Sequence, residues 1–258
     1  MEFEELSSTN EYCKGNDIRT DCIIRAHRQT SGRGRMGRKF VSEEGGLYLS
    51  YCYLPPDLKA EKLMPLTGLC AVAVHCAIEK ATGLNADIKW TNDLLLYGKK
   101  ICGILVETVL GEDGKVEKLI IGIGINTNQK SECFEGELEN IASSIYALTG
   151  KETDETKLLK YLSMLIHGVY SMVCKGDFDR MEEYAEYYRA HCVTIGKEVR
   201  ILRPELVSAG KDPRGAYAED PSVFPKAIAV DIDDNFGLIV RHKDGKEEKI
   251  TFGEISIK

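Results

Sequence analysis

Apolar residues recur along this chain with two periods, and each period predicts a type of element. Spacings of three and four residues mark one face of a helix, whereas short apolar or alternating runs mark strands. The helical spacing occurs in three segments, 60–82, 154–174 and 178–192. Gly83 predicts the end of the first helix, and Thr153 or Asp154 predicts a cap for the second. We expect the second and third helices to cover a sheet.

Strand patterns lie before, between and after these helices. CIIRA at 22–26 and LYLSYCYL at 47–54 predict two strands, the second ended by Pro55 and Pro56. Asp87–Trp90 and the apolar run 94–126 follow. That run is broken at Gly98-Lys99 and at 111–114 by residues typical of hairpins. These segments therefore predict a meander of antiparallel strands.

The pattern changes after Ile195 to short alternating segments, at 197–202, 227–232, 237–242 and 249–257. Such segments separated by turns are typical of a small β-barrel. The proline-rich connection 203–226 predicts an exposed loop. The whole pattern predicts an α+β protein, with a mixed, mostly antiparallel sheet covered by helices in residues 1–194 and a small barrel in 195–258.

Composition narrows the class of protein. The 258 residues carry a net charge of -7, which argues against general nucleic-acid binding. The nine cysteines form no CxxC pair, and the five histidines form no metal-ligand pattern, so we expect reduced thiols and no tightly bound transition metal. The N-terminus lacks the features of a targeting signal, and no apolar run approaches the roughly 18 residues of a membrane span. We therefore expect a cytoplasmic protein.

One stretch is basic although the whole chain is acidic. Cys22–Ser42 contains no Asp or Glu, and its cations are Arg25, Arg28, Arg33, Arg35, Arg38 and Lys39. Its glycines at 32, 34 and 37 allow backbone conformations and close approaches that other residues resist. Arginine offers planar forks of donors suited to phosphate and carboxylate oxygens. The stretch therefore predicts a mobile loop that closes over an anion, although a solvated basic loop without function has the same composition.

Three further segments place polar groups at strand ends. They are Lys89–Asp93, Lys100–Leu105 and Gly122–Asn128. Each also has a structural explanation, because Lys89 and Asp93 could form a salt bridge, Lys100 could protect a sheet edge, and the glycines could allow close packing.

The ordered motifs GRGRxGR, KWxND, KxxGIL and GIGIN resemble the catalytic domain of biotin-protein ligases. The resemblance extends from Ser8-Thr9-Asn10 to Gly253–Ser256. It implies a class II aminoacyl-tRNA-synthetase-like biotin/lipoate ligase fold followed by an SH3-like barrel. It also implies ATP and Mg²⁺ as cofactors, biotin as substrate, biotinyl-5'-AMP as intermediate, and a biotin carboxyl carrier domain as acceptor. DNA and membrane partners are not expected, and a homodimer is possible. Because only seven residues precede Ser8, we expect a ligase without an N-terminal DNA-binding domain.

The resemblance also implies roles for single residues. Biotin would contact Ser8, Thr9, Gln29, Gly32, Arg33, Lys100 and Gly103. The nucleotide would contact Arg35, Arg38, Phe40, Asn92 and Asn126. Lys89 is the first candidate for catalysis, with Arg33 and Asp93, and Asp93 is also a candidate Mg²⁺ ligand.

These roles suit acyl-adenylate chemistry. A carboxylate must approach a phosphate, so cations are the main requirement, and the resulting anhydride needs protection from water. Phe40 stands where the family usually has Trp and Thr91 where it usually has Pro, and Trp90 is the only tryptophan, so the adenine platform is not identified. A lipoate-protein ligase and a non-catalytic sensor of biotin or nucleotide remain as alternatives.

Overall fold

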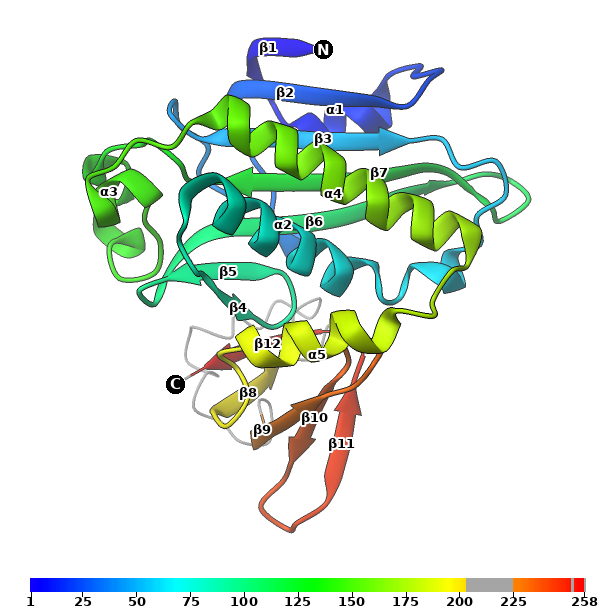
Figure 1. The fold of residues 1–258 in the computed structure, drawn as a ribbon, viewed down its shortest axis with the longest axis vertical. Helices are drawn as coiled ribbons and strands as arrows, with labels where there is room; N and C mark the ends of the chain where they lie inside the picture. The colour runs from blue at the N-terminus through cyan, green and yellow to red at the C-terminus, as the bar shows by residue number, and fades with distance from the viewer. Residues whose placement is uncertain (203–224, 252, 258) are drawn as a thin grey trace. The chain divides into compact units, whose positions relative to one another are not determined.

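The computed structural model describes residues 1–202, 225–251 and 253–257 (Figure 1). Two compact units are present, one made of Met1–Asp87 and Asn92–Phe178, and the other of Ile88–Thr91 and Asp179–Lys258. Almost all of the predicted proline-rich loop, residues 203–224, lies outside the described part of the chain. The nine cysteines are all free, in keeping with the expected thiols.

The larger sheet has the strand order β1-β2-β3-β7-β6-β5-β4. Its strands are β1 Glu2–Leu6, β2 Cys22–Gln29, β3 Leu47–Tyr53, β4 Asp87–Lys89, β5 Asp93–Leu96, β6 Lys99–Leu110 and β7 Val116–Ile125. β1 pairs with β2 in parallel, while the pairs β2–β3, β3–β7, β7–β6 and β6–β5 are antiparallel. The predicted mixed, mostly antiparallel sheet is therefore confirmed. The sequence did not predict β1, because its EFEEL segment is acidic and lies at the edge of the sheet with most side chains exposed.

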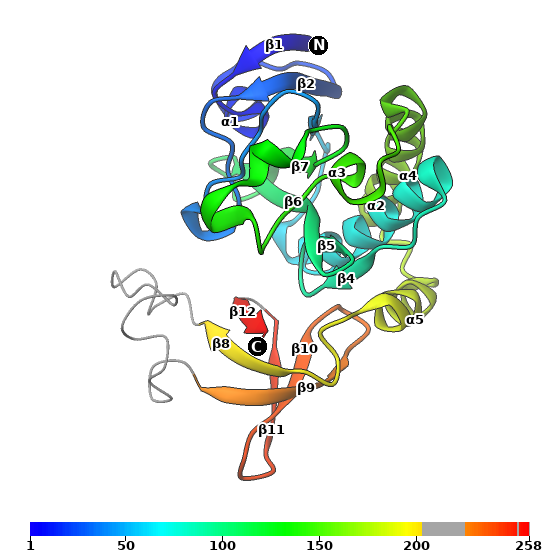
Figure 2. The same cartoon turned by 90° about the vertical axis from the view of Figure 1, so that its left-hand side faces the viewer.

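Two long helices cover one face of this sheet in the first unit, α2 Leu66–Thr82 and α4 Glu155–Lys175 (Figures 1 and 2). The short helix α1, Thr9–Gly15, contacts β2, β3 and β7 on the opposite face (Figure 2). Another short helix, α3 Ile145–Thr149, follows β7, and 3-10 turns occupy Arg35–Gly37, Ala60–Leu63, Ser131–Phe134 and Gly136–Leu138. The sheet thus has a long-helix face and an α1 face.

Helix α2 begins later than the apolar spacing predicts. A 3-10 turn at Ala60–Leu63 precedes it, and the α-helix starts after Pro65, whose missing N–H is tolerated at a helix start. Gly83 ends the helix in the left-handed conformation, with φ 75°, as expected. The segment Ala60–Thr82 is long and apolar enough to cross a membrane, but 67% of its apolar 18-residue window is buried inside the structure. It is the core helix of the first unit, where it packs against α4.

The cap expected for the 154–174 helix is confirmed, because Asp154 accepts a hydrogen bond from the Lys157 N–H at 2.9 Å. The next helix, α5 Met181–His191, differs from expectation. It belongs to the second unit and contacts β9 there, so the partner of α4 over the larger sheet is α2.

The second unit contains a five-stranded antiparallel sheet in the order β11-β10-β9-β8-β12. Its strands are β8 Glu198–Leu202, β9 Lys226–Ile232, β10 Leu238–Arg241, β11 Glu247–Ile250 and β12 Glu254–Ile257. This arrangement agrees with a small barrel-like domain. Trp90 is buried in this unit, where its indole N–H donates to the Phe236 carbonyl at 2.8 Å and its backbone N–H donates to Thr194 Oγ1 at 3.0 Å. The peptide bond between Trp90 and Thr91 is cis.

Candidate ligand-binding site

Three glycines form a strip without side chains on the α1 face of the sheet. Gly103 of β6 pairs with Gly124 of β7, and Gly122 lies two residues away on β7. A Cβ at Gly122 would lie 2.3 Å from Oδ1 of Asn10, and one at Gly124 would lie 2.7 Å from the Phe40 ring. A Cβ at Gly103 would meet the same ring at 3.1 Å. The glycines of GIGIN and KxxGIL therefore allow an amide and an aromatic ring to lie against the strands.

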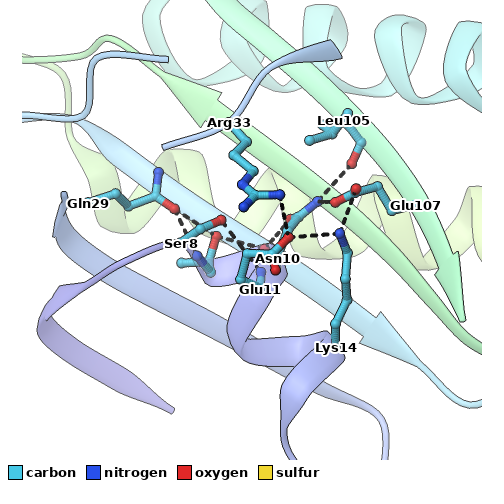
Figure 3. Close-up of polar contacts among 10 residues, drawn as sticks. Ser8, Asn10, Glu11, Lys14, Gln29, Arg33, Leu105 and Glu107 are labelled. Atoms are coloured by element: carbon cyan, nitrogen blue, oxygen red, sulfur yellow. Dashed lines mark hydrogen bonds and ion pairs between the residues drawn. The ribbon is translucent and has the colours of Figure 1, made fainter. Parts of the chain in front are cut away.

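An amide–hydroxyl cluster, made of Thr9, Asn10, Gln29, Ser42 and Ser50, lies beside this strip. Figure 3 shows two of its members, Asn10 and Gln29. The Thr9 N–H donates to Gln29 Oε1 at 2.8 Å, and Gln29 Nε2 donates to Ser42 Oγ at 2.9 Å. Ser50 Oγ is hydrogen-bonded to Thr9 Oγ1 at 2.7 Å and to Asn10 Oδ1 at 2.6 Å. The cluster is pre-organised by its own hydrogen bonds, and its serines, Thr9 and Asn10 are buried.

Local structure explains how α1 joins this cluster. Ser8 has an extended backbone and caps α1, its Oγ accepting from the Glu11 N–H at 3.5 Å. The next two residues, Thr9 and Asn10, therefore start the helix over β3 and β7. The structure brings together Ser8, Thr9 and Gln29, the residues predicted for the biotin head.

No role was predicted from the sequence for Ser42, Ser50 or Asn10. Ser50 has a recognisable signal, because it is the one serine within the tyrosine- and leucine-rich strand β3 and is completely buried. A hydroxyl inside such a strand needs a polar partner. Its partners come from α1, about 40 residues earlier in the chain, so only the fold reveals them.

The basic loop lies between β2 and β3, as predicted, and folds back on itself. Its base is closed by the Phe40 N–H donating to the Gly32 carbonyl at 2.9 Å, and a bridge joins Arg33 to Lys39. A Cβ at Gly32 would lie 2.3 Å from the Phe40 carbonyl oxygen, which explains the glycine. The tip turns at Met36 and Gly37, with φ of 53° and 73°.

The cations of the basic stretch divide into two groups. Arg25 forms an ion pair with Glu155 at 2.7 Å, and Arg28 pairs with Glu5 at 2.6 Å, so these two connect β2 to neighbouring elements. Arg33 belongs to the loop and lies 3.2 Å from Glu11 of α1. Arg35 and Arg38 flank the turn at the loop tip. The loop arginines are thus the ones placed near the cluster or at the tip.

Lys100 and Asp93 form an ion pair at the end of the glycine strip, with Nζ 2.7 Å from Oδ1. Lys100 and Gly103 are three residues apart, which in a regular strand would place them on opposite faces. The β5–β6 register shifts between Leu94 and Leu95, and this bulge turns Lys100 toward Gly103. The ammonium also lies 5.6 Å from the centre of the Phe40 ring. The predicted residues Lys100, Asp93, Gly103 and Phe40 therefore meet.

The predicted residues Asn92, Asn126 and Lys89 lie outside the glycine strip and the amide–hydroxyl cluster. The Asn92 amide donates to the Ile104 carbonyl at 2.8 Å, and the Asn126 amide donates to the Ser143 carbonyl at 3.1 Å. Both amides thus stabilise backbone segments next to the site. Lys89 is grouped with the second unit through the segment Ile88–Thr91.

Two further observations concern metal and thiol chemistry. In the described ranges 1–202, 225–251 and 253–257, no group of three His, Cys, Asp or Glu side chains could hold a metal ion. Asp93, the predicted Mg²⁺ ligand, is neutralised by Lys100. Cys102 is completely buried, and burial raises the pKa of its thiol, so it stays protonated and is a poor nucleophile.

Comparison with known proteins supports the resemblance seen in the motifs. Residues 3–126 match the model of the Biotin/lipoate A/B protein ligase family. The chain is 41% identical over 169 residues to the Bifunctional ligase/repressor BirA of Bacillus subtilis, covering 64% of this chain and 51% of that protein. It is 26% identical to the Biotin--[acetyl-CoA-carboxylase] ligase of Mycobacterium tuberculosis over 93% of this chain and 80% of that protein.

Among solved structures, a biotin protein ligase from Aquifex aeolicus in complex with biotin and ATP matches with a TM-score of 0.78 and 28% identity. The match covers 100% of this chain and 97% of that one. The chain spans about half the length of the BirA proteins of Bacillus that it matches, 47% and 51%.

Proposed function

Residues 3–126 of the chain match the Biotin/lipoate A/B protein ligase family, and on this ground we propose that the chain is an ATP-dependent biotin-protein ligase. It would activate biotin as biotinyl-5'-AMP and transfer the biotinyl group to one lysine of a biotin carboxyl carrier domain. Residues 1–194 would carry the chemistry, and residues 195–258 would form an accessory domain.

One observation carries the proposal beyond family membership. The amide–hydroxyl cluster, Arg33 of the basic loop and the Lys100–Asp93 pair all gather on the α1 face, next to the glycine strip. Polar groups for a ligand head, a flat surface for its ring and cations for its carboxylate therefore occur together. A small acid with a polar heterocycle matches this combination.

The first step joins two anions. A carboxylate oxygen of biotin attacks the α-phosphorus of ATP, and the bond to the bridging oxygen breaks to release pyrophosphate. Two negative charges 4 Å apart repel by about 4 kcal/mol at an effective dielectric constant near 20, so cations must offset this cost. Arg33 and Lys100 would bind the carboxylate, and Arg35 and Arg38 would bind the phosphates.

The head and ring of biotin need complementary groups. Its ureido group offers N–H donors and a carbonyl acceptor, and the side chains of Ser8, Thr9 and Gln29 can exchange their present bonds for these. Phe40 and Gly103 would form the wall beside the ring. Ser50 would hold Thr9 in place from below.

In the second step, the acceptor lysine amine attacks the carbonyl carbon and AMP leaves. Asp93 could orient that amine, since its carboxylate already binds an ammonium group, that of Lys100. Lys89 is proposed as the catalytic cation on the strength of the KWxND motif. Asn92 and Asn126 would position the nucleotide together with the backbone segments that they stabilise.

We propose that Mg²⁺ binds together with ATP. Mg²⁺ is usually held by one or two carboxylates plus substrate phosphates, and Asp93 is the carboxylate proposed here, once its present partner Lys100 binds the biotin carboxylate instead. When bound, the ion would neutralise phosphate charge.

We propose the cytoplasm as the site of action, with no DNA or membrane partner. The acidic net charge of -7 and the family resemblance support this assignment. A homodimer formed through sheet edges is proposed by the same resemblance.

The test is a pyrophosphate-release assay with ATP, Mg²⁺ and either biotin or lipoate, coupled to label transfer onto a carrier domain. We expect biotin-dependent release, and losses of about 100- to 1,000-fold for Arg33→Ala, Lys89→Ala and Lys100→Ala, the range found when one transition-state charge contact is removed. Lys99→Ala is the matched control, because Lys99 is next to Lys100 and donates to the Glu139 backbone carbonyl. Turnover with lipoate alone would assign the chain to lipoate ligases, and biotin binding without turnover would make it a sensor.

A further inference from the structure

A chain of charged side chains connects the basic loop to the buried cluster (Figure 3). Arg33 Nη1 lies 3.2 Å from Glu11 Oε1, and Lys14 Nζ donates to the same oxygen at 2.8 Å. Lys14 also pairs with Glu107 at 2.7 Å, and Glu107 accepts from Asn10 Nδ2 at 2.8 Å. We call Arg33, Glu11, Lys14 and Glu107 the charge chain.

The two ends of the charge chain differ in exposure. The side chains of Lys14 and Glu107 are 28% and 26% exposed, whereas that of Arg33 is 55% exposed. Ion pairs with such exposed members are weak, so the Arg33–Glu11 contact can exchange readily with a competing anion. The Lys14–Glu107 contact is more stable, because Glu107 also accepts a hydrogen bond from the buried amide of Asn10.

Lys14 lowers the free-energy cost of breaking the Arg33–Glu11 contact. The hydrogen bond from Lys14 lowers the pKa of Glu11, so Glu11 is ionised at neutral pH. When Arg33 leaves, Glu11 and Glu107 share the one positive charge of Lys14, and both carboxylates keep their contact with its ammonium group. Arg33 can therefore turn to a ligand while α1 and the cluster stay in place.

We infer that Glu11 is a positioning residue that holds Arg33 beside the site in the ligand-free protein and releases it to the carboxylate of the incoming acid. The inference rests on the proposed function, in which Arg33 binds biotin carboxylate. Glu11 is then an internal competitor of the substrate for one guanidinium group. It also keeps the loop near the cluster, because Arg33 lies in the loop and Glu11 directly follows Thr9 and Asn10 in α1.

The inference is tested by a double-mutant cycle on biotin binding, measured by calorimetry. Glu11→Gln should bind biotin about two- to five-fold more tightly at low salt, the range set by the strength of exposed pairs. The gain should disappear near 1 M salt, where the Debye length is about 3 Å. In an Arg33→Gln background, Glu11→Gln should have no effect. Glu4→Gln, which removes one negative charge at an exposed position of β1, controls for net charge.

A second measurement needs no ligand. Limited trypsin digestion of the ligand-free protein should cut Glu11→Gln after Arg35 and Arg38 about two- to five-fold faster than the unmodified chain, because loss of the contact raises the open population of the loop. Glu4→Gln should be cut at the unmodified rate.

The outcomes separate the two ideas. Equal cleavage of all variants, or a Glu11→Gln effect on biotin that persists without Arg33, would overturn the role of Glu11. No biotin binding by the unmodified chain would overturn the proposed function and this inference with it, and faster cleavage of Glu11→Gln would then show that the Arg33–Glu11 contact exists without that substrate.

Discussion

At the scale of single residues, glycine has a specific task on the α1 face. Gly122 makes room for the Asn10 amide, and Gly124 and Gly103 make room for the Phe40 ring. The Asn10 amide in turn bonds to Ser50 and Glu107, so the space at one glycine determines a network of contacts. Each glycine is thus needed because a side chain at its position would occupy the space of the Asn10 amide or the Phe40 ring.

A Gly122→Ala substitution tests this explanation. The added Cβ would displace Asn10 from its partners, and we expect a loss of about 1–3 kcal/mol in the free energy of unfolding, typical of overpacking. Urea unfolding measures it. Gly168→Ala is the control, because Gly168 lies in helix α4, where an added Cβ would meet no heavy atom of another segment within 4 Å, and we expect a gain of about 0.5–1 kcal/mol from helix propensity. Equal effects at the two sites would contradict the close-approach explanation.

At the scale of elements, strand β3 serves both faces of the sheet. Ser50 points to the α1 face, while Tyr51 and Tyr53 point to the long-helix face, where Tyr51 contacts Ser163 of α4 and Tyr53 stacks on Tyr170 with ring centres 3.8 Å apart. One strand therefore connects the polar site to the packing of α4. From Ser50 to Tyr53 small and aromatic residues alternate, and every residue of the strand is buried, as expected for a strand with two occupied faces.

The buried phenol of Tyr51 predicts a dependence on alkaline pH. Burial raises the pKa of Tyr51 to about 12, above the value near 10 of an unfolded chain. The unfolded state therefore releases this proton first, and stability that is complete below pH 10 falls as the pH rises toward 12. This one group accounts for up to roughly 3 kcal/mol of the loss.

We expect Tyr51→Phe to lose less unfolding free energy between pH 8 and pH 11 than the unmodified chain, measured by urea unfolding at each pH. The comparison is of slopes, because the variant also loses the Ser163 contact at every pH. Tyr97→Phe, at a 70% exposed turn, is the matched control. A change of slope as large for Tyr97→Phe as for Tyr51→Phe would contradict the assignment to burial.

At the scale of the whole molecule, the two units divide the chain in an interleaved way. Ile88–Thr91 groups with the second unit although its neighbours on both sides belong to the first. The motif KWxND is therefore split, with Lys89 and Trp90 in one unit and Asn92 and Asp93 in the other.

Ligand binding should stabilise the folded chain by mass action. Biotin at 100 times its dissociation constant contributes about 2.7 kcal/mol, which for a chain of this size corresponds to a rise in Tm of about 5–10 °C. Differential scanning fluorimetry with biotin, and with lipoate as the matched acid, measures it. A rise with lipoate and none with biotin would contradict the proposed substrate.

Several features were predictable because they are local. The basic loop between two strands, the Asp154 cap and the Gly83 helix end each depend on a few adjacent residues, and the structure confirms all three. The late start of α2 could also have been read from Pro65. The edge strand β1 could not be predicted in this way, because it pairs with β2 through main-chain hydrogen bonds and its acidic side chains give no strand pattern.

The amino-acid sequence alone specifies the chemistry that is available: which residues carry charge, amide, hydroxyl or no side chain, and the order of the motifs that resemble those of biotin-protein ligases. Which of these residues come into contact depends on the folded arrangement of the strands, helices and loops. Ser50 reaches Asn10 because β3 lies under α1, Lys100 reaches Asp93 through a bulge, and Arg33 reaches Glu11 because the folded basic loop lies beside that helix. Contacts between distant residues depend on packing and register, which no local pattern encodes.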